Sequence, residues 1–292
     1  MKKVGYFFFS FLPALASITL QFLVMIPMIA VTMMAAFHQS SFQGMMDQIY
    51  RIFSNLDFST AISAVYAAAG ICIFGLWYQL QFQGNVTKNV KKWMTPRLFL
   101  GVVCIVPVLQ LATGFLITGV SVLFPEWLEF YEKLMDSAGF SGDPSPLLIL
   151  YAVILGPIAE EFTFRGVTMA SAKRALPFWA ANLLQAFLFG AFHMNIIQGI
   201  YAFALGLVLG LICEKSGCIW YSVVLHMGFN FWGTFMAEFV TGISPVMVCI
   251  LYLVFIFLGI LGVWLITHNL PSKEKISSSP KDSRVPSDIY YK

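Results

Sequence analysis

The stretch from Leu147 to Arg174 reads LLILYAVILGPIAEEFTFRGVTMASAKR. Its apolar part is as long as the roughly 20 residues that a helix needs to cross a hydrocarbon core of about 30 Å. Two carboxylates and a guanidinium, Glu160, Glu161 and Arg165, stand within it. Charged groups at that depth cost roughly 2.5 to 3.5 kcal/mol each and usually face a protein interior or a water-filled cavity. The stretch therefore predicts a membrane helix with partnered charges.

The rest of the chain has the same apolar character. Of its 292 residues, 59% are hydrophobic and 11% are charged, against roughly 25% charged residues in soluble domains. A net charge of +3 is too small to indicate nucleic acid, so the expected partner is the lipid bilayer. We predict an all-α polytopic membrane helix bundle of about eight transmembrane helices. The predicted spans are 11–36, 60–83, 98–123, 147–170, 177–194, 196–213, 218–238 and 246–267.

Lysine and arginine residues gather in alternate connections between the spans. The basic segments are Lys2–Lys3, the loop 85–97, the turn at Lys173–Arg174 and the tail after His268. By the positive-inside rule these segments are cytoplasmic, which places both termini in the cytosol. The opposite loops, 37–59 and 125–146, each carry a single basic residue, and the stretch 127–135 is predicted as a short interfacial helix.

The distribution of charge divides the chain into four parts. They are an N-terminal three-helix region with outer loops (1–145), a charged core (146–240), a C-terminal transmembrane helix (241–268) and a disordered cytoplasmic tail (269–292). The start resembles a signal peptide, but its apolar character continues to Phe37, which favours a retained first helix. The five cysteines lack metal-site or disulfide spacing and are interpreted as reduced packing residues.

The spacing of the charges in the fourth span separates two roles. Glu161 and Arg165 are four residues apart and can pair on one helical face, whereas Glu160 points about 100° away. A buried ion pair that only fixes helix packing would explain Glu161 and Arg165. It leaves Glu160 without a use, which favours a carboxylate kept for proton transfer.

Two further spans contribute imidazoles and an amide. Phe189 and His193 end the fifth span, while His226 and Asn230 lie four apart on one face of the seventh. Each histidine alone is explained equally well by a hydrogen bond between helices. Together with Glu160 they supply a general base, metal ligands or oxyanion donors, and an orienting group, the parts needed to activate water against an amide carbonyl.

The heights of these residues along their helices leave one difficulty. At 1.5 Å per residue, Glu160 lies roughly 20 Å and His193 roughly 25 Å above the turn between their helices. His226 lies only roughly 14 Å above its own turn near 214–217. A meeting of all three requires helix tilt, unequal turn depths or a broken sixth helix.

Glu160-Glu161-x-x-x-Arg165, Phe189-x-x-x-His193 and His226-x-x-x-Asn230, in this order on successive helices, resemble the three motifs of the CPBP family of intramembrane proteases. That family includes the type II CAAX prenyl endopeptidases and the bacterial Abi and bacteriocin self-immunity proteins. The resemblance covers about 150–232. It implies hydrolysis of membrane-embedded or lipidated peptides, at a site reached from the cytosol in the prenyl-protein enzymes, and a location in the plasma membrane of a prokaryote.

The resemblance also implies roles for the motif residues. Glu160 would activate water with His193 close to it, His226 and Asn230 would stabilise the oxyanion or help to hold a metal, and Glu161 and Arg165 would support the site. A divalent metal, preferably zinc, would be ligated by Glu160, His193 and His226. The same residues could instead act without a metal.

Two other functions stay open. The first is a catalytically silent bacteriocin-immunity or partner-binding membrane protein that keeps the motifs as structural contacts. The second is a proton-coupled transporter that uses Glu160 and the histidines as a relay, although the sequence shows no evident inverted repeat. The substrate and the oligomeric state do not follow from the sequence.

Overall fold

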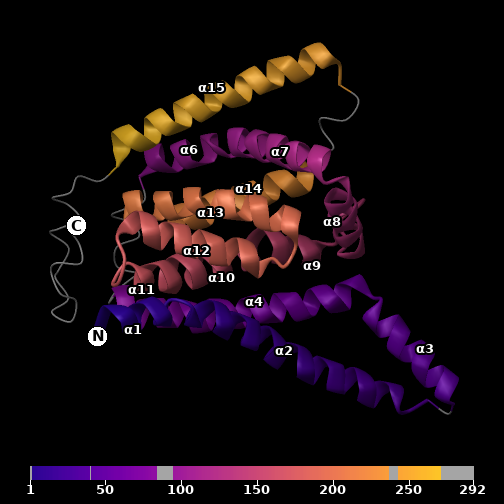
Figure 1. Ribbon diagram of the computed structural model, residues 1–292. Helices are drawn as coiled ribbons and strands as arrows, with labels where there is room; N and C mark the ends of the chain where they lie inside the picture. Colours follow the sequence, from indigo (N-terminus) through magenta and orange to yellow (C-terminus); the bar gives the residue numbers. More distant parts are fainter. Residues whose placement is uncertain (1, 40, 84–94, 237–242, 271–292) are drawn as a thin grey trace.

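The computed structural model describes residues 2–39, 41–83, 95–236 and 243–270, and every regular element in these ranges is a helix (Figure 1). The N-terminal elements are α1 (Lys2–Phe9), α2 (Leu12–Ala36), α3 (Phe42–Phe53), α4 (Leu56–Tyr78), the π-helical segment η1 (Gln79–Gln83), α6 (Pro96–Cys104), α7 (Val106–Leu123) and α8 (Pro125–Ser137). The later elements are α9 (Pro146–Ile149), η2 (Leu150–Leu155), α10 (Gly156–Glu161), η3 (Phe162–Met169), α11 (Ala170–Ala172), α12 (Phe178–Phe192), α13 (Ile196–Ser216), α14 (Ile219–Phe235) and α15 (Pro245–Asn269).

The predicted polytopic helical bundle is confirmed. Within the described ranges, six helices are long and apolar enough to cross a membrane, namely Lys2–Ala36, Leu56–Phe82, Pro96–Leu123, Pro146–Ala172, Ile196–Ser216 and Pro245–Asn269. The predicted fifth and seventh spans are the shorter helices α12 and α14, of 15 and 17 residues. At about 1.5 Å per residue they measure roughly 22 and 25 Å, which is less than a hydrocarbon core of about 30 Å.

Several sequence predictions fall partly or wholly outside the described residues. They concern positions 237 and 238 at the end of the seventh span, most of the basic loop 85–97, and the tail beyond Leu270. The outer loop 37–59 contains a helix that was not predicted, α3, which begins after the N-cap Ser41. The predicted interfacial stretch 127–135 is helical and belongs to α8.

The fourth span is one continuous helix that contains two π-helical segments. The wide π-helical turns of η2 come directly before Gly156 and Pro157, and those of η3 follow Glu161. Proline has no N–H and its ring crowds the carbonyl four residues earlier, so a wider preceding turn lets the helix continue through Pro157. The span is therefore not broken at Gly156-Pro157, and both glutamates lie between two widened segments.

Helices α12 and α13 form a tightly packed antiparallel hairpin. Gly206 lies opposite Ala186, where an added Cβ would come within 3.1 Å, and a Cβ at Gly210 would overlap the amide oxygen of Asn182. Small residues let two membrane helices approach closely and gain packing contacts. The hairpin turns at Met194, which adopts a left-handed conformation with φ of 51°, and α13 then begins after the N-cap Asn195.

The two ends of the bundle differ in charge. The start of α1, the turn after α11, the end of α13 and the end of α15 lie at one end, and α3 and α8 lie at the other (Figure 1). We call the first the basic end, because its described charges include Lys2, Lys3, Arg97, Lys173, Arg174 and Lys215. We call the second the acidic end, because it carries Asp47, Asp57, Glu126, Glu129, Glu132, Asp136 and Asp143 beside Arg51 and Lys133.

Candidate active site

The centre of the site is a buried carboxylate with two partners. Oε1 of Glu161 accepts hydrogen bonds from Nη1 of Arg165 at 2.7 Å and from Nδ1 of His226 at 2.9 Å. The side chains of Glu161 and Arg165 have no exposed surface, and that of His226 is 3% exposed. The pairing expected from the four-residue spacing is therefore present, and it extends to a histidine on α14.

The contact with Glu161 determines how His226 is oriented. Because a carboxylate oxygen only accepts, Nδ1 of His226 carries the proton of this hydrogen bond and Nε2 is left for other partners. Nε2 lies 3.6 Å from Oε2 of Glu160, which is longer than a direct hydrogen bond. The side chain of Glu160 is 20% exposed, whereas that of Glu161 is 0% exposed. The two adjacent acids therefore have different environments, one sealed and one accessible.

Arg165 is held on its far side by the motif residue Phe189 and by polar groups of α12 and α13 that the sequence did not indicate. Its Nη2 donates to the carbonyl of Gly206 at 3.4 Å, and its guanidinium lies 4.3 Å above the ring of Phe189. Nε2 of Gln185 donates to the same Gly206 carbonyl at 2.9 Å and to Oδ1 of Asn182 at 2.7 Å. An amide pair three residues apart inside an otherwise apolar helix was the signal that could have revealed them.

Phe189 separates the two motif histidines. Its ring centroid lies 4.9 Å from that of His193 and 5.6 Å from that of His226, both in edge-to-face geometry. Such pairs contribute about 0.5–1.5 kcal/mol beyond burial. Nδ1 of His193 bonds to the Phe189 carbonyl at 2.8 Å, so Nε2 is the ring nitrogen of His193 that remains for the site.

Asn230 bonds to the backbone of the fourth span. Its Nδ2 donates to the carbonyl of Ala152, in the π-helical segment η2, at 2.8 Å. The described contacts thus bring Glu160, Glu161, Arg165 and His226 together directly. They bring His193 to the group through Phe189, and they hold Asn230 one turn away.

The structure removes one of the three explanations for the difference in helix heights. Helix α13 is unbroken from Ile196 to Ser216, so a broken sixth helix is excluded. His226 contacts Glu161 and faces Phe189, one turn below His193, instead of reaching the level of His193 itself. The motif residues therefore occupy two adjacent levels of the bundle.

Three tyrosines lie in the neighbourhood of the accessible glutamate. Tyr66 of α4, Tyr151 of η2 and Tyr201 of α13 all lie within electrostatic range of Glu160. The hydroxyl of Tyr66 bonds to that of Ser17 at 2.5 Å. Sequence reasoning missed these tyrosines, because aromatic residues in membrane helices carry no spacing signal of their own.

The metal predicted from the family needs three donors converging on one point. Ligands about 2.0–2.2 Å from a tetrahedral ion lie about 3.4 Å from each other, so Glu160 and His226 are suitably placed. In the described ranges, however, no group of three or more His, Cys, Asp or Glu side chains is arranged to hold an ion. The described residues therefore do not form a complete ligand set, and the metal stays a prediction.

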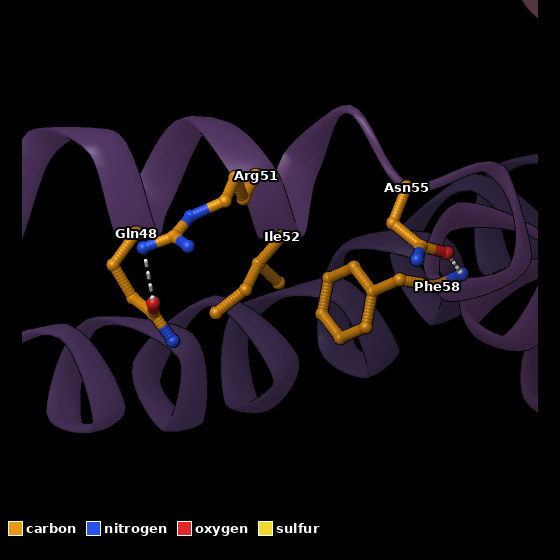
Figure 2. A pocket seen from close by; sticks show the side chains of 5 residues that line it. All are labelled: Gln48, Arg51, Ile52, Asn55 and Phe58. Carbon is orange, nitrogen blue, oxygen red and sulfur yellow. Dashed lines mark hydrogen bonds between the residues drawn. The ribbon is translucent and has the colours of Figure 1, made fainter.

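A hollow of about 410 Å³ lies far from these residues, at the corner between α3 and α4 (Figure 2). Its polar groups are bonded locally, since Arg51 donates to Gln48 at 3.1 Å and Asn55 accepts from the backbone of Phe58 at 3.0 Å. It therefore presents no candidate chemistry.

Comparison with known proteins gives a family match over the part of the chain that holds these residues. Residues 142–232 match the family described as type II CAAX prenyl endopeptidase Rce1-like. Over 85 residues the chain is 27% identical to "Putative membrane peptidase YdiL" of Bacillus subtilis (strain 168), which covers 29% of this chain and 35% of that relative. The chain thus matches about a third of that relative's length, and no solved structure matches it. These findings support the family predicted from the three motifs, because residues 142–232, which hold all three, match the Rce1-like family, and part of the chain resembles part of a membrane peptidase.

Proposed function

We propose that the protein is an intramembrane endopeptidase that hydrolyses peptide bonds of membrane-associated or lipidated peptides. The observation that carries this proposal is the difference between the two glutamates. Glu161 is sealed in an ion pair and orients His226, while Glu160 is accessible and faces the other nitrogen of that imidazole. A purely structural ion pair accounts for Glu161 and gives Glu160 no role.

The proposed reaction begins with a water molecule between Glu160 and the scissile carbonyl. Glu160 takes a proton from the water, whose oxygen adds to the carbonyl carbon while the carbonyl electrons move to the oxygen. The protonated Glu160 then gives its proton to the amide nitrogen, the C–N bond breaks, and a carboxylic acid and an amine leave. General acid–base catalysis of this kind contributes about 10²–10⁴-fold.

The negative charge on the carbonyl oxygen needs hydrogen-bond donors. His226 supplies Nε2–H when it is protonated, with Glu161 holding its other nitrogen. Asn230 supplies a second donor after its amide leaves the Ala152 carbonyl. One such donor contributes about 2.7–4 kcal/mol. His193, packed against Phe189, helps to orient the water.

The orientation of the protein is part of the same proposal. Lysine and arginine residues concentrate at the basic end, which the positive-inside rule places in the cytosol together with both termini. The membrane itself is proposed to be a prokaryotic plasma membrane, as the resemblance implies.

The test is cleavage of a panel of membrane-anchored and lipidated peptides by purified protein in detergent. Glu160→Gln should lower kcat by at least about 10²-fold, because it removes the general base. Glu129→Gln is the matched control. The hydrogen bond from Lys133, 2.6 Å away, lowers the pKa of that exposed carboxyl, so the control also removes an ionised acid and should leave cleavage unchanged.

Two other results would count against a peptidase. Absence of cleavage by folded wild-type protein would favour an immunity or partner-binding protein. Proton-coupled flux in liposomes that is lost in Glu160→Gln, without cleavage, would favour a transporter. A chelator arm decides separately whether the reaction depends on a metal.

A further inference from the structure

The site has different surroundings toward the two ends of the bundle. On the side of the basic end, every residue from Glu161 to Met169 is buried. The neighbouring helices close the same level with side chains of 0% exposure, namely Asn182, Gln185, Leu209, Tyr221 and Leu225. The described residues therefore form a packed layer between the site and the basic end.

Hydrogen bonds also join the two helices that close this layer. The carbonyls of Gly206 and Leu207 and the amides of Asn182 and Gln185 are bonded to one another across the α12–α13 contact. A Cβ could not be added at Gly210 without overlapping Asn182. A peptide approaching from the basic end would have to separate these two helices.

On the side of the acidic end the same site is partly exposed. Glu160, His193 and Asn230 are all of intermediate burial. Met194, at the turn that follows His193, is 76% exposed. Near the start of α13, Tyr201 places its hydroxyl 3.4 Å from that of Tyr131 on α8.

The orientation of the bundle then indicates from which side of the membrane the site is reached. In the described part of the chain, Arg51 and Lys133 are the basic residues of the acidic end, and they stand among seven carboxylates there, Asp47, Asp57, Glu126, Glu129, Glu132, Asp136 and Asp143. An end so poor in lysine and arginine faces away from the cytosol. Helix α12, which begins at the basic end, carries His193 about 22 Å from it, in the outer half of a hydrocarbon core of about 30 Å.

We infer that the catalytic groups are reached from the extracytoplasmic side, so that the substrate is a peptide segment already exported across the membrane and still attached to it or near it. This inference rests on the proposed function and names the substrate class of the same site. It differs from the cytosolic access implied by the prenyl-protein enzymes. Cytosolic lipidated C-termini are accordingly not the substrates that this geometry favours.

Accessibility is measured without any substrate. Single-cysteine variants Glu160→Cys, Met194→Cys and Lys215→Cys are made in a background whose five native cysteines are replaced. They are treated with a membrane-impermeant cationic methanethiosulfonate in intact spheroplasts and in inverted vesicles. A thiol reacts fast only as the hydrated thiolate, so labelling reports both water and side.

The expected labelling is distinct for each position. Glu160→Cys and Met194→Cys should react in spheroplasts and at least tenfold more slowly in inverted vesicles, while Lys215→Cys should show the reverse preference. Gln185→Cys, at a position of 0% exposure, should react in neither. Reaction of Glu160→Cys from the cytoplasmic side only, or from neither side, would overturn the inference. If this variant fails to fold, Met194→Cys decides the side.

A cleavage arm separates this inference from the proposed function. A charged peptide that is cleaved in detergent is added outside spheroplasts and, separately, outside inverted vesicles. Cleavage in spheroplasts supports the inference, whereas cleavage in inverted vesicles alone overturns it and leaves the peptidase intact. Failure of cleavage in detergent would remove the peptidase proposal without changing the labelling result.

Discussion

The first and the fourth predicted spans have similar apolar sequences and opposite surroundings. Lys2–Ala36 has a mean hydropathy of 2.2 with 11% of its most apolar window buried, and Pro146–Ala172 has a mean hydropathy of 1.7 with 50% buried. The first is solvated by lipid along most of its length, while the second is enclosed by other helices. The difference shows that hydropathy identifies a span and that polar contacts determine its place in the bundle.

Charge explains why the enclosed span has a defined position. Lipid tails are as apolar as leucine, so helices in a bilayer gain little from hydrophobic contact and depend on packing and hydrogen bonds. Arg165 and Glu161 can be accommodated only where partners surround them, and those partners come from α12, α13 and α14. In α2 the buried Ser17, bonded to Tyr66, is a smaller contact of the same kind.

The largest expected effect comes from breaking the ion pair. Arg165→Met leaves the fully buried carboxylate of Glu161 without its cation, and removal of one partner of a buried pair costs about 3–5 kcal/mol. The variant should unfold at a clearly lower temperature in detergent. Arg51→Met, which removes an exposed arginine of α3, is the control and should leave the melting temperature nearly unchanged.

A second substitution tests the cause of that loss. Glu161→Leu combined with Arg165→Met removes both charges, and the double variant should be more stable than Arg165→Met alone, because no unpaired charge remains. Equal stability of Arg165→Met and wild type would show that Glu161 is neutral in the folded protein. The burial of the fourth span and the exposure of the first would then not depend on charge.

A pair of leucines tests the same contrast through packing. Leu209 of α13 is 0% exposed and Leu23 of α2 is 61% exposed. Leu209→Ala leaves a cavity in the bundle and should cost about 1–3 kcal/mol, less than in a soluble core, because the transfer term from lipid is small. Leu23→Ala exchanges one lipid-facing side chain for another and should cost almost nothing. Thermal unfolding of both variants in the same detergent measures the difference, and equal losses would show that α2 packs against protein in solution.

The sequence predicts those features that depend on spacing within one helix. The pairing of Glu161 with Arg165, the shared face of His226 and Asn230, and the order of the spans all follow from periodicity. The part of the fold and of the candidate site that follows from the sequence is therefore largely local.

Relative depth between helices was not predictable in the same way. It depends on where each turn lies and on the close approach of α12 and α13 at Gly206 and Gly210, which are properties of the assembled bundle. For the same reason the position of Phe189 between two imidazoles does not follow from its place one turn before His193. The π-helical turns around Glu160 also have no simple sequence signal apart from Pro157.

The smallest expected effect is that of replacing Gln185. It separates a role in positioning the site from a contribution to stability. This side chain is outside all three motifs, yet it shares the Gly206 carbonyl with Arg165, which in turn holds Glu161 and through it His226. Gln185→Met keeps the volume and removes the hydrogen bonds. We expect kcat to fall about tenfold, equivalent to about 1.4 kcal/mol in the transition state, with KM unchanged.

The control for Gln185 is a buried polar group of the lipid-facing region. Thr32→Val removes a hydroxyl that bonds within α2 to the carbonyl of Met28 and should leave kcat unchanged. If Gln185→Met lowers the melting temperature as much as Arg165→Met does, the residue is structural and not a positioning residue. A normal melting temperature with reduced kcat would instead show that the buried amide of Gln185 helps to orient the imidazole of His226.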